Sequence, residues 1–288
     1  MRIFTKLFII GLFCHAFAGF ADSVSNRVTI TARGDGPDVV LIPGLACSSA
    51  VWDATAKHLE GHYRLHIVQV AGFGGAPAQG NAKGAVVQPT VDAIDAYIKT
   101  NNLKSPTVIG HSLGGLMGMM LALQHPEDTG KLMIVDSFPF IGVLFGAADV
   151  TAVTDQASQI RDMMLNESQD DYAKGEESFL PALVKSQERL KLAIKWAVAS
   201  DKSVVARAMY EDFTTDLRPK LKDIKTPVTM LYPYDSGMNQ EQETVDAMYR
   251  DNFAALPNKK LVRIDNSMHF IMLDQPDEFA KQVDAFLK

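Results

Sequence analysis

The sequence predicts an α/β fold in which a mostly parallel central sheet carries helices on both faces. Three observations point to it. Short apolar runs typical of buried strands alternate with longer segments of helical spacing, one such run leads into a Gly-x-Ser-x-Gly pattern, and a single long interval interrupts the alternation. Parallel strands need crossover connections, which are usually helices, so regular strand-helix alternation favours a parallel sheet.

The alternation can be followed along the chain. An edge strand is expected at 28–32, and buried strands at 38–43, 63–70, 106–110, 131–135, 227–232 and 260–264. The expected helices lie at 49–59, 90–101, 113–124, 241–253 and 276–287. Continuous apolar runs such as 38–43 indicate strands that are covered on both faces.

The interval 138–217 contains no convincing buried strand and is rich in helix-forming residues. A structureless loop of that length is implausible inside a compact domain, so the interval is interpreted as a helical cap or lid. The core is then formed by 22–137 and 218–288. The strongly apolar stretch 138–145 is expected either to line an acyl pocket or to pack the cap against the core.

The N-terminus predicts export. Arg2 and Lys6 precede an apolar run, and small residues gather around 16–21, as in a secretory signal peptide spanning 1–21. The protein is therefore expected in the periplasm or secreted, with no stable membrane insertion after cleavage.

Charge and cysteine content add two exclusions. Signal cleavage changes the net charge from −6 to −8, because it leaves 26 basic and 34 acidic residues. With no basic stripe to displace counterions from phosphates, nucleic acid is not an expected partner. Cleavage also leaves Cys47 as the one remaining cysteine, so no internal disulfide is expected. The sequence does not indicate an oligomeric state.

The segment 106–115 predicts a catalytic serine. Ser112 lies between Gly110 and Gly114, after a β-branched apolar run and before an apolar segment without proline. A sharp strand-to-helix turn of this kind, a nucleophile elbow, exposes the serine hydroxyl and directs the helix N-terminus toward it. The two glycines leave space where the strand and helix backbones pass closest.

A serine nucleophile requires a base and an acid that orients the base. His269 follows the last expected strand, in a loop at the carboxyl edge of the sheet, where ligands bind in open α/β sheets. Asp235 follows the strand at 227–232 and completes the order Ser, Asp, His. Asp136 is the alternative acid, because it ends the preceding strand at the same edge.

An oxyanion hole is expected from two backbone N–H groups. One belongs to Leu113, at the helix N-terminus. The other belongs to Leu45, or alternatively Ala46, in the loop 43–48 that follows an earlier strand. No metal site is predicted: the spacing of four between His58, His62 and His66 is interrupted by Gly61 and the start of a strand.

Together these segments resemble the α/β-hydrolase superfamily, in its serine esterase or lipase-like branch with a helical lid. The resemblance extends over nearly all of the mature chain: residues 41–45 resemble the oxyanion loop, 71–75 the glycine turn, 110–115 the elbow, and 268–270 with 275–279 the histidine loop and final helix. The loop that carries Asp235 departs from the family's pattern, since Pro233 stands where members of the family commonly have glycine. The resemblance implies that the lid is inserted after the sixth strand.

The expected function is an exported serine hydrolase that cleaves a carboxylic ester, thioester or lactone through an acyl-enzyme on Ser112. A cofactor-independent haloperoxidase or perhydrolase, an aminopeptidase and a carbon–carbon bond hydrolase are alternatives, because one triad serves several leaving groups. The expected partner is a small ester-type substrate, and no cofactor is expected.

Overall fold

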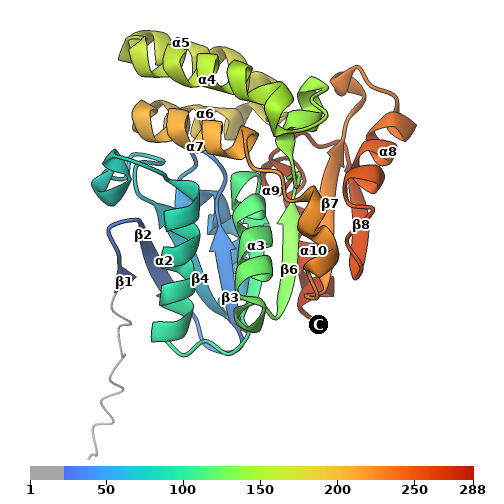
Figure 1. Ribbon diagram of the computed structural model, residues 1–288. Helices are drawn as coiled ribbons and strands as arrows, with labels where there is room; N and C mark the ends of the chain where they lie inside the picture. Colours follow the sequence, from blue (N-terminus) through green and yellow to red (C-terminus); the bar gives the residue numbers. More distant parts are fainter. Residues whose placement is uncertain (1–22) are drawn as a thin grey trace, which may run out of the picture.

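The computed structural model describes residues 23–288 and contains an eight-stranded sheet between two layers of helices (Figure 1). The predicted signal peptide lies outside the described residues. The strand order is β1-β2-β4-β3-β5-β6-β7-β8. The strands are β1 Ser23–Val24, β2 Val28–Arg33, β3 Asp38–Ile42, β4 Arg64–Val70, β5 Thr107–His111, β6 Lys131–Val135, β7 Val228–Tyr234 and β8 Lys259–Asp265.

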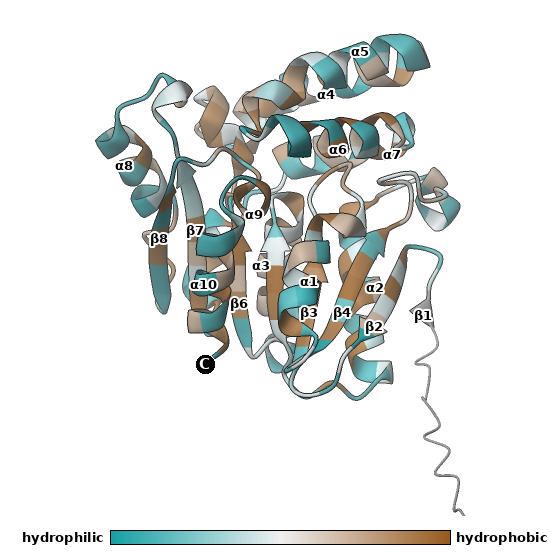
Figure 2. Ribbon diagram, turned by 180° about the vertical axis from the view of Figure 1, so that it is seen from behind, coloured by the Kyte–Doolittle hydropathy of each residue, from teal (hydrophilic) through white to brown (hydrophobic). Residues whose placement is uncertain are grey.

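Ten α-helices are present among these residues. They are α1 Asp53–Leu59, α2 Val87–Thr100, α3 Leu113–Gln124, α4 Val150–Asn166, α5 Gln169–Phe179, α6 Gln187–Val198, α7 Lys202–Phe213, α8 Gln242–Asn252, α9 Ile271–Asp274 and α10 Pro276–Leu287. Helices α2 and α3 cover one face of the sheet, and α1 and α10 cover the other (Figures 1 and 2). The predicted α/β class and a strand in each expected segment are confirmed.

The sheet is parallel from β3 onward, and β2 pairs antiparallel with β4. The central strands are apolar (Figure 2), and the side chains of 39–42 and 132–135 are at most 1% exposed, which explains why these runs do not alternate with polar residues. Within residues 23–288, no helix has both the length and the apolarity needed to cross a bilayer.

The chain between β6 and β7 forms helices α4 to α7, which lie above the carboxyl edge of the sheet (Figure 1). Hydrogen bonds attach this helical insertion to the core. The Ser200 hydroxyl accepts from the Gly74 N–H at 2.8 Å and donates to the Ala46 carbonyl at 3.1 Å, and the Asp201 N–H donates to the Gly72 carbonyl at 2.8 Å. The insertion is therefore anchored on the loops that follow β3 and β4.

The apolar stretch 138–145 divides into two parts. Phe138 and Phe140 are buried, and the Phe138 ring stacks on that of Tyr249 with centroids 4.6 Å apart. Leu144 and Phe145 are 48% and 51% exposed. Phe138 therefore packs the insertion against the core, Phe140 packs inside the insertion, and Leu144 and Phe145 lie on the surface.

The nucleophile elbow depends on the absence of two Cβ atoms. A Cβ on Gly110 would lie 2.2 Å from the Gly114 carbonyl oxygen, and one on Gly114 would lie 2.3 Å from the Ile42 carbonyl oxygen. These neighbours are backbone atoms, which cannot rotate away. The glycines therefore allow β3, β5 and α3 to approach closely.

This packing predicts the stability of two alanine variants. Gly114→Ala should lower the free energy of unfolding by about 1–3 kcal/mol, because strand and helix backbones must separate. Gly175→Ala is the matched control: Gly175 is exposed inside α5, and a Cβ there meets no atom within 4 Å. The control should gain about 0.5–1 kcal/mol from improved helix propensity. Urea denaturation measures both, and equal stabilities would contradict the close approach.

Candidate active site at the carboxyl edge of the sheet

Ser112 lies in the sharp turn between β5 and α3. Its backbone has φ 54° and ψ −124°, a strained conformation for a residue with a side chain. Hydrogen bonds hold this turn: the Ser112 N–H donates to the Val135 carbonyl at 2.9 Å, and its own carbonyl accepts from the N–H groups of Gly115 and Leu116. The predicted elbow geometry is present, and Ser112 remains partly accessible.

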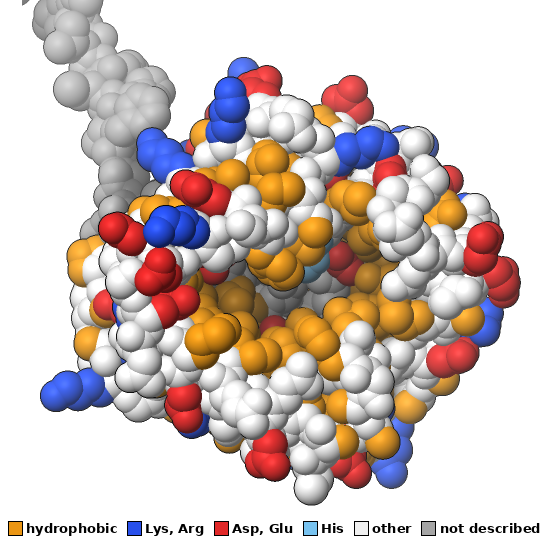
Figure 3. Space-filling view, turned by 90° about the horizontal axis from the view of Figure 1, so that it is seen from above, with side chains coloured by type: hydrophobic (Ala, Val, Ile, Leu, Met, Phe, Trp, Pro, Cys, Tyr) orange, Lys and Arg blue, Asp and Glu red, His pale blue; other side chains and the backbone are white. Residues whose placement is uncertain are grey.

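The molecular surface above the carboxyl edge of the sheet is hollowed. Figure 3 looks down on the insertion and shows apolar side chains around the opening, with histidine and acidic side-chain atoms inside it. A separate hollow of about 420 Å³, lined in part by Lys131, Pro227 and Lys259, lies at the amino ends of β6, β7 and β8. That second hollow is at the opposite edge of the sheet from Ser112.

The loop after β3 packs directly against the serine. A Cβ on Gly44 would lie 3.0 Å from the Ser112 Cβ and 2.9 Å from the His111 Nδ1, so a side chain here would displace the loop. Within residues 23–288, the N–H groups of Leu45, Ala46 and Leu113 donate to no protein acceptor. Free donors beside a nucleophile are what an oxyanion hole requires. The geometry leaves both Leu45 and Ala46 available as the second donor.

His269 is hydrogen-bonded to Asp136. The imidazole Nδ1 donates to the Asp136 Oδ2 at 2.6 Å. Asp136 directly follows β6, its N–H donates to the Leu231 carbonyl at 2.8 Å, and its side chain is only 9% exposed. A proton held on Nδ1 leaves Nε2 of His269 as the nitrogen that can accept a proton.

Tyr249 provides a second hydrogen bond to the same carboxylate. Its hydroxyl donates to the Asp136 Oδ1, and its ring stacks on Phe138 and Tyr232. Burial, together with the negative charge of Asp136, raises the pKa of Tyr249 well above its ordinary value, so the hydroxyl remains a donor. Sequence reasoning missed this residue, because a tyrosine on α8 has no local signal that relates it to β6.

Asp235 does not contact His269, which corrects the prediction that Asp235 orients the histidine. Its Oδ2 pairs with the Lys185 ammonium, from the segment before α6, and its Oδ1 accepts from the Gly237 N–H at 2.8 Å. These two hydrogen bonds, the one from Lys185 foremost, hold the pKa of Asp235 below its ordinary value. Asp235 therefore joins the insertion to the core, and the alternative acid Asp136 is the partner of His269.

His111 supports the loop that carries His269. Its Nε2 donates to the His269 carbonyl at 3.1 Å, and the two ring centroids are 4.5 Å apart. Burial, with the nearby charge of His269, lowers the pKa of His111 well below its ordinary value, so it stays neutral. The buried imidazole of His111 therefore packs against His269 and hydrogen-bonds to its backbone.

Asp274 fastens the same loop to the insertion. Its carboxylate accepts from the Met268 N–H at 3.0 Å, the Lys185 N–H at 2.9 Å and the Ser186 N–H at 3.0 Å. The Phe270 N–H also donates to the Leu183 carbonyl at 3.2 Å. The histidine loop is therefore held from below by His111 and from above by the segment 183–186.

Ser112 and His269 are not hydrogen-bonded to each other in this structure. His269 nevertheless lies directly against His111, the residue before the nucleophile. Hydrogen bonds between a nucleophile and its base are often long or poorly aligned without substrate and tighten when it binds.

Cys47, in the oxyanion loop, is buried, and burial raises the pKa of its thiol to about 12. A thiol in this state is not a nucleophile at neutral pH. Cys47 is therefore not a competing nucleophile.

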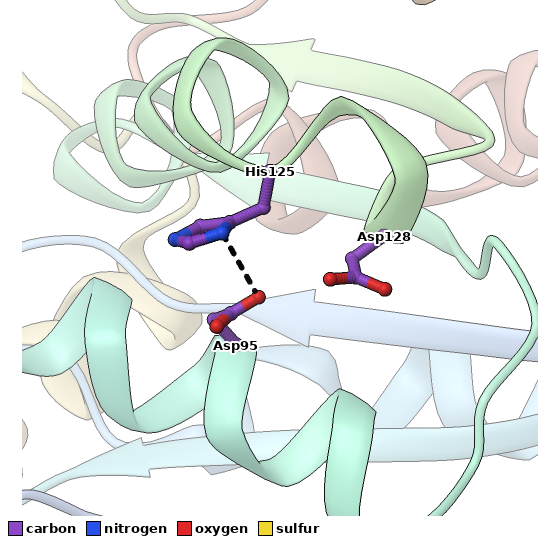
Figure 4. A group of neighbouring side chains, drawn as sticks. All are labelled: Asp95, His125 and Asp128. Atoms are coloured by element: carbon purple, nitrogen blue, oxygen red, sulfur yellow. Dashed lines mark ion pairs between the residues drawn. The ribbon is translucent and has the colours of Figure 1, made fainter.

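Asp95, His125 and Asp128 form a cluster with the donor types of a metal site (Figure 4). The Lys99 ammonium lies among them, 2.8 Å from Asp95, 3.5 Å from Asp128 and 3.4 Å from His125. It therefore supplies the positive charge that the two carboxylates require. The twelve-residue helix α3 places this cluster about 18 Å from the elbow.

Two of the three histidines that are spaced by four have different partners. His58 pairs with Asp284 at 2.8 Å on the surface, while His66 is buried in β4 between Tyr97 and Asp38. These different partners keep them from forming a common site.

Comparison with known proteins agrees with this geometry. A model of the alpha/beta hydrolase family matches residues 39–282. A pimeloyl-[acyl-carrier protein] methyl ester esterase of Aliivibrio fischeri is 26% identical over 263 residues, which cover 88% of this chain and 95% of the relative. A putative carbamate hydrolase of Serratia proteamaculans is 28% identical over 250 residues, covering 84% and 88%.

Among solved structures, the enol-lactonase of Burkholderia xenovorans superposes with a TM-score of 0.73 at 20% identity, covering 90% of this chain and 96% of its own. At 20% sequence identity, this similarity shows a shared fold alone. The match to the family model extends from β3 into α10 and includes Ser112, Asp136 and His269. The chain therefore belongs to the alpha/beta hydrolase family.

Proposed function

We propose that this protein is a serine hydrolase that cleaves carboxylic esters with Ser112 as nucleophile, His269 as base and Asp136 as the orienting acid. The observation that carries the proposal is the hydrogen bond from His269 Nδ1 to the buried Asp136, formed beside a nucleophile elbow and beneath a hollow. The esterase and the lactonase among the similar proteins both act on ester bonds, which supports this substrate class.

The chemistry follows from where the protons are held. With Nδ1–H donated to Asp136, Nε2 of His269 takes the Ser112 proton while the serine oxygen attacks the ester carbonyl. The N–H groups of Leu113 and Leu45 stabilise the resulting oxyanion. The carbon–oxygen bond to the alcohol then breaks, the alcohol leaves with the proton from His269, and water releases the acid by the same steps.

The helical insertion acts as the lid in this proposal. It covers the carboxyl edge of the sheet, and Asp274, Lys185 and Ser200 attach it to the histidine and oxyanion loops. Apolar side chains around the hollow favour an ester with an apolar portion. Cleavage of a thioester or a lactone would use the same steps.

Loss of the nucleophile should abolish activity. Wild type is expected to react with a fluorophosphonate probe and to hydrolyse p-nitrophenyl esters, whereas Ser112→Ala should do neither. Ser137→Ala, which removes another buried hydroxyl near the elbow, is the control and should still be labelled. Equal labelling of wild type and Ser112→Ala, or none of either, would refute the serine mechanism.

The two acids should differ in importance. Asp136→Asn should lower kcat by roughly two to four orders of magnitude, because the amide no longer fixes the imidazole tautomer or balances its charge. Asp235→Asn keeps the shape but weakens the pair with Lys185, so it should act mainly on stability and lower kcat less than about tenfold. Steady-state kinetics on one ester decides the order, and the reverse ranking would return the acid role to Asp235.

Export is proposed from the character of residues 1–21. The full chain should appear outside the cytoplasm of a bacterial host, with a mature N-terminus at Gly19 or Asp22 by mass spectrometry. Ile9→Arg places a charge in the apolar run and should leave the chain unprocessed inside the cell. Cytoplasmic, unprocessed wild-type protein would rule export out.

A further inference from the structure

Asp212 is a buried acid that the proposed mechanism does not use. It lies in the last turn of α7 and is only 7% exposed. Within residues 23–288, no group hydrogen-bonds or ion-pairs with its carboxyl. Its oxygens are not among the unpaired atoms that are sealed from solvent, so the carboxyl retains some contact with water.

The packing of α7 directs this side chain toward the active site. Val204, Ala208 and Asp212 follow one another at a spacing of four and form one buried stripe. Val204 contacts the turn after β4, since a Cβ on Gly72 would lie 2.7 Å from it. Glu211 faces α2 and accepts from the N–H groups of Val86 and Val87, and Phe213 faces Phe140.

The electrostatic partner of Asp212 is His269. The two groups lie near enough for a positive charge on the imidazole to lower the pKa of the carboxyl. The buried stripe on α7 and the interaction with His269 indicate the same direction for the side chain of Asp212. The carboxyl of Asp212 therefore faces the space next to the catalytic histidine.

This placement contributes no stabilising contact to the fold. Burial is the stronger influence and raises the pKa of Asp212 to about 7, because a desolvated carboxylate without donors is unfavourable. The C-terminal end of a helix adds further repulsion toward a negative charge. A buried acid whose charged form is destabilised in this way, next to a proposed reaction centre, is typical of a functional residue.

We propose that Asp212 binds a protonated amine of the substrate, so that the ester this enzyme prefers carries an ammonium group on its acyl or its alcohol part. This inference rests on the proposed ester hydrolysis. Buried polar groups are nearly always paired, and here the partner would come from the ligand. An ammonium supplies both hydrogen-bond donors and the compensating charge, which a neutral hydroxyl does not.

The other charged groups around the site favour a cation over an anion. Asp136 is occupied by His269 and Tyr249, and the Lys185 ammonium is occupied by Asp235. Asp212 differs from these groups because, within residues 23–288, its carboxyl has no hydrogen-bond or ion-pair partner. An anionic substrate group would meet it with repulsion.

Two matched ester pairs test this proposal. On the acyl side, p-nitrophenyl 6-aminohexanoate is compared with p-nitrophenyl heptanoate; on the alcohol side, 4-aminobutyl hexanoate is compared with pentyl hexanoate. In each pair a methyl replaces the ammonium. For the pair that matches the site, wild type should prefer the amine in kcat/KM by about ten- to a hundredfold, the usual worth of a hydrogen bond to a charged group.

Asp212→Asn should remove this preference, and Asp155→Asn should keep it, because Asp155 is an exposed acid on the insertion that undergoes the same charge change. The ratio within a pair cancels any influence of Asp212 on His269. Equal losses on the amine and the neutral ester would therefore overturn substrate binding. No preference in either pair would also overturn it while leaving ester hydrolysis intact, whereas hydrolysis of none of the four esters would instead contradict the proposed function.

Thermal melting at pH 8 provides a second measurement. Asp212→Asn should melt at the same or a higher temperature than wild type, because it removes a buried charge that the fold does not pair. A clear fall in melting temperature would indicate a structural role and contradict the proposal.

Discussion

The hydrogen bond between His269 and Asp136 is the interaction on which the whole site depends. It joins two loops separated by 133 residues, and in the proposed mechanism it leaves Nε2 of His269 to take the proton of Ser112. Asp136 is buried, and burying a carboxyl group carries a free-energy cost unless hydrogen-bond donors pair with it. The hydroxyl of Tyr249 and the imidazole N–H of His269 offset that cost with two hydrogen bonds.

The helical insertion is part of the site's construction as well as its cover. Asp274 joins the insertion to the histidine loop, Ser200 joins it to the oxyanion loop, and Asp235 uses its charge to hold Lys185. The last contact explains why a second acid lies at the same edge without orienting His269. Two carboxylates follow neighbouring strands: Asp136 accepts hydrogen bonds from His269 and Tyr249, whereas Asp235 pairs with the ammonium of Lys185.

Asp212 differs from both of these acids because, within residues 23–288, no group hydrogen-bonds or ion-pairs with its carboxyl. The other carboxylates at this edge are stabilised by donors, so their charges serve the fold. Under the proposal, this acid on the helical insertion binds the ammonium group of the substrate and so contributes to substrate selection. Substitutions on α7 would then alter specificity without altering the nucleophile, the base or the oxyanion donors.

The strand runs, the elbow glycines and the histidine after the last strand were determined by the sequence itself, because local patterns specify them. Apolar runs of fixed length form buried parallel strands, and Gly110 and Gly114 are required wherever two backbones touch. Such features need no knowledge of distant residues.

Only the tertiary structure decided between Asp136 and Asp235, since both follow strands that end at one edge. The choice came from Tyr249 on α8 and Lys185 before α6, which lie 113 and 50 residues away from the acids they bind. The roles of His111 and Asp212 were equally invisible in the sequence. Each depends on which side chain lies opposite it after folding, and no local pattern encodes that pairing.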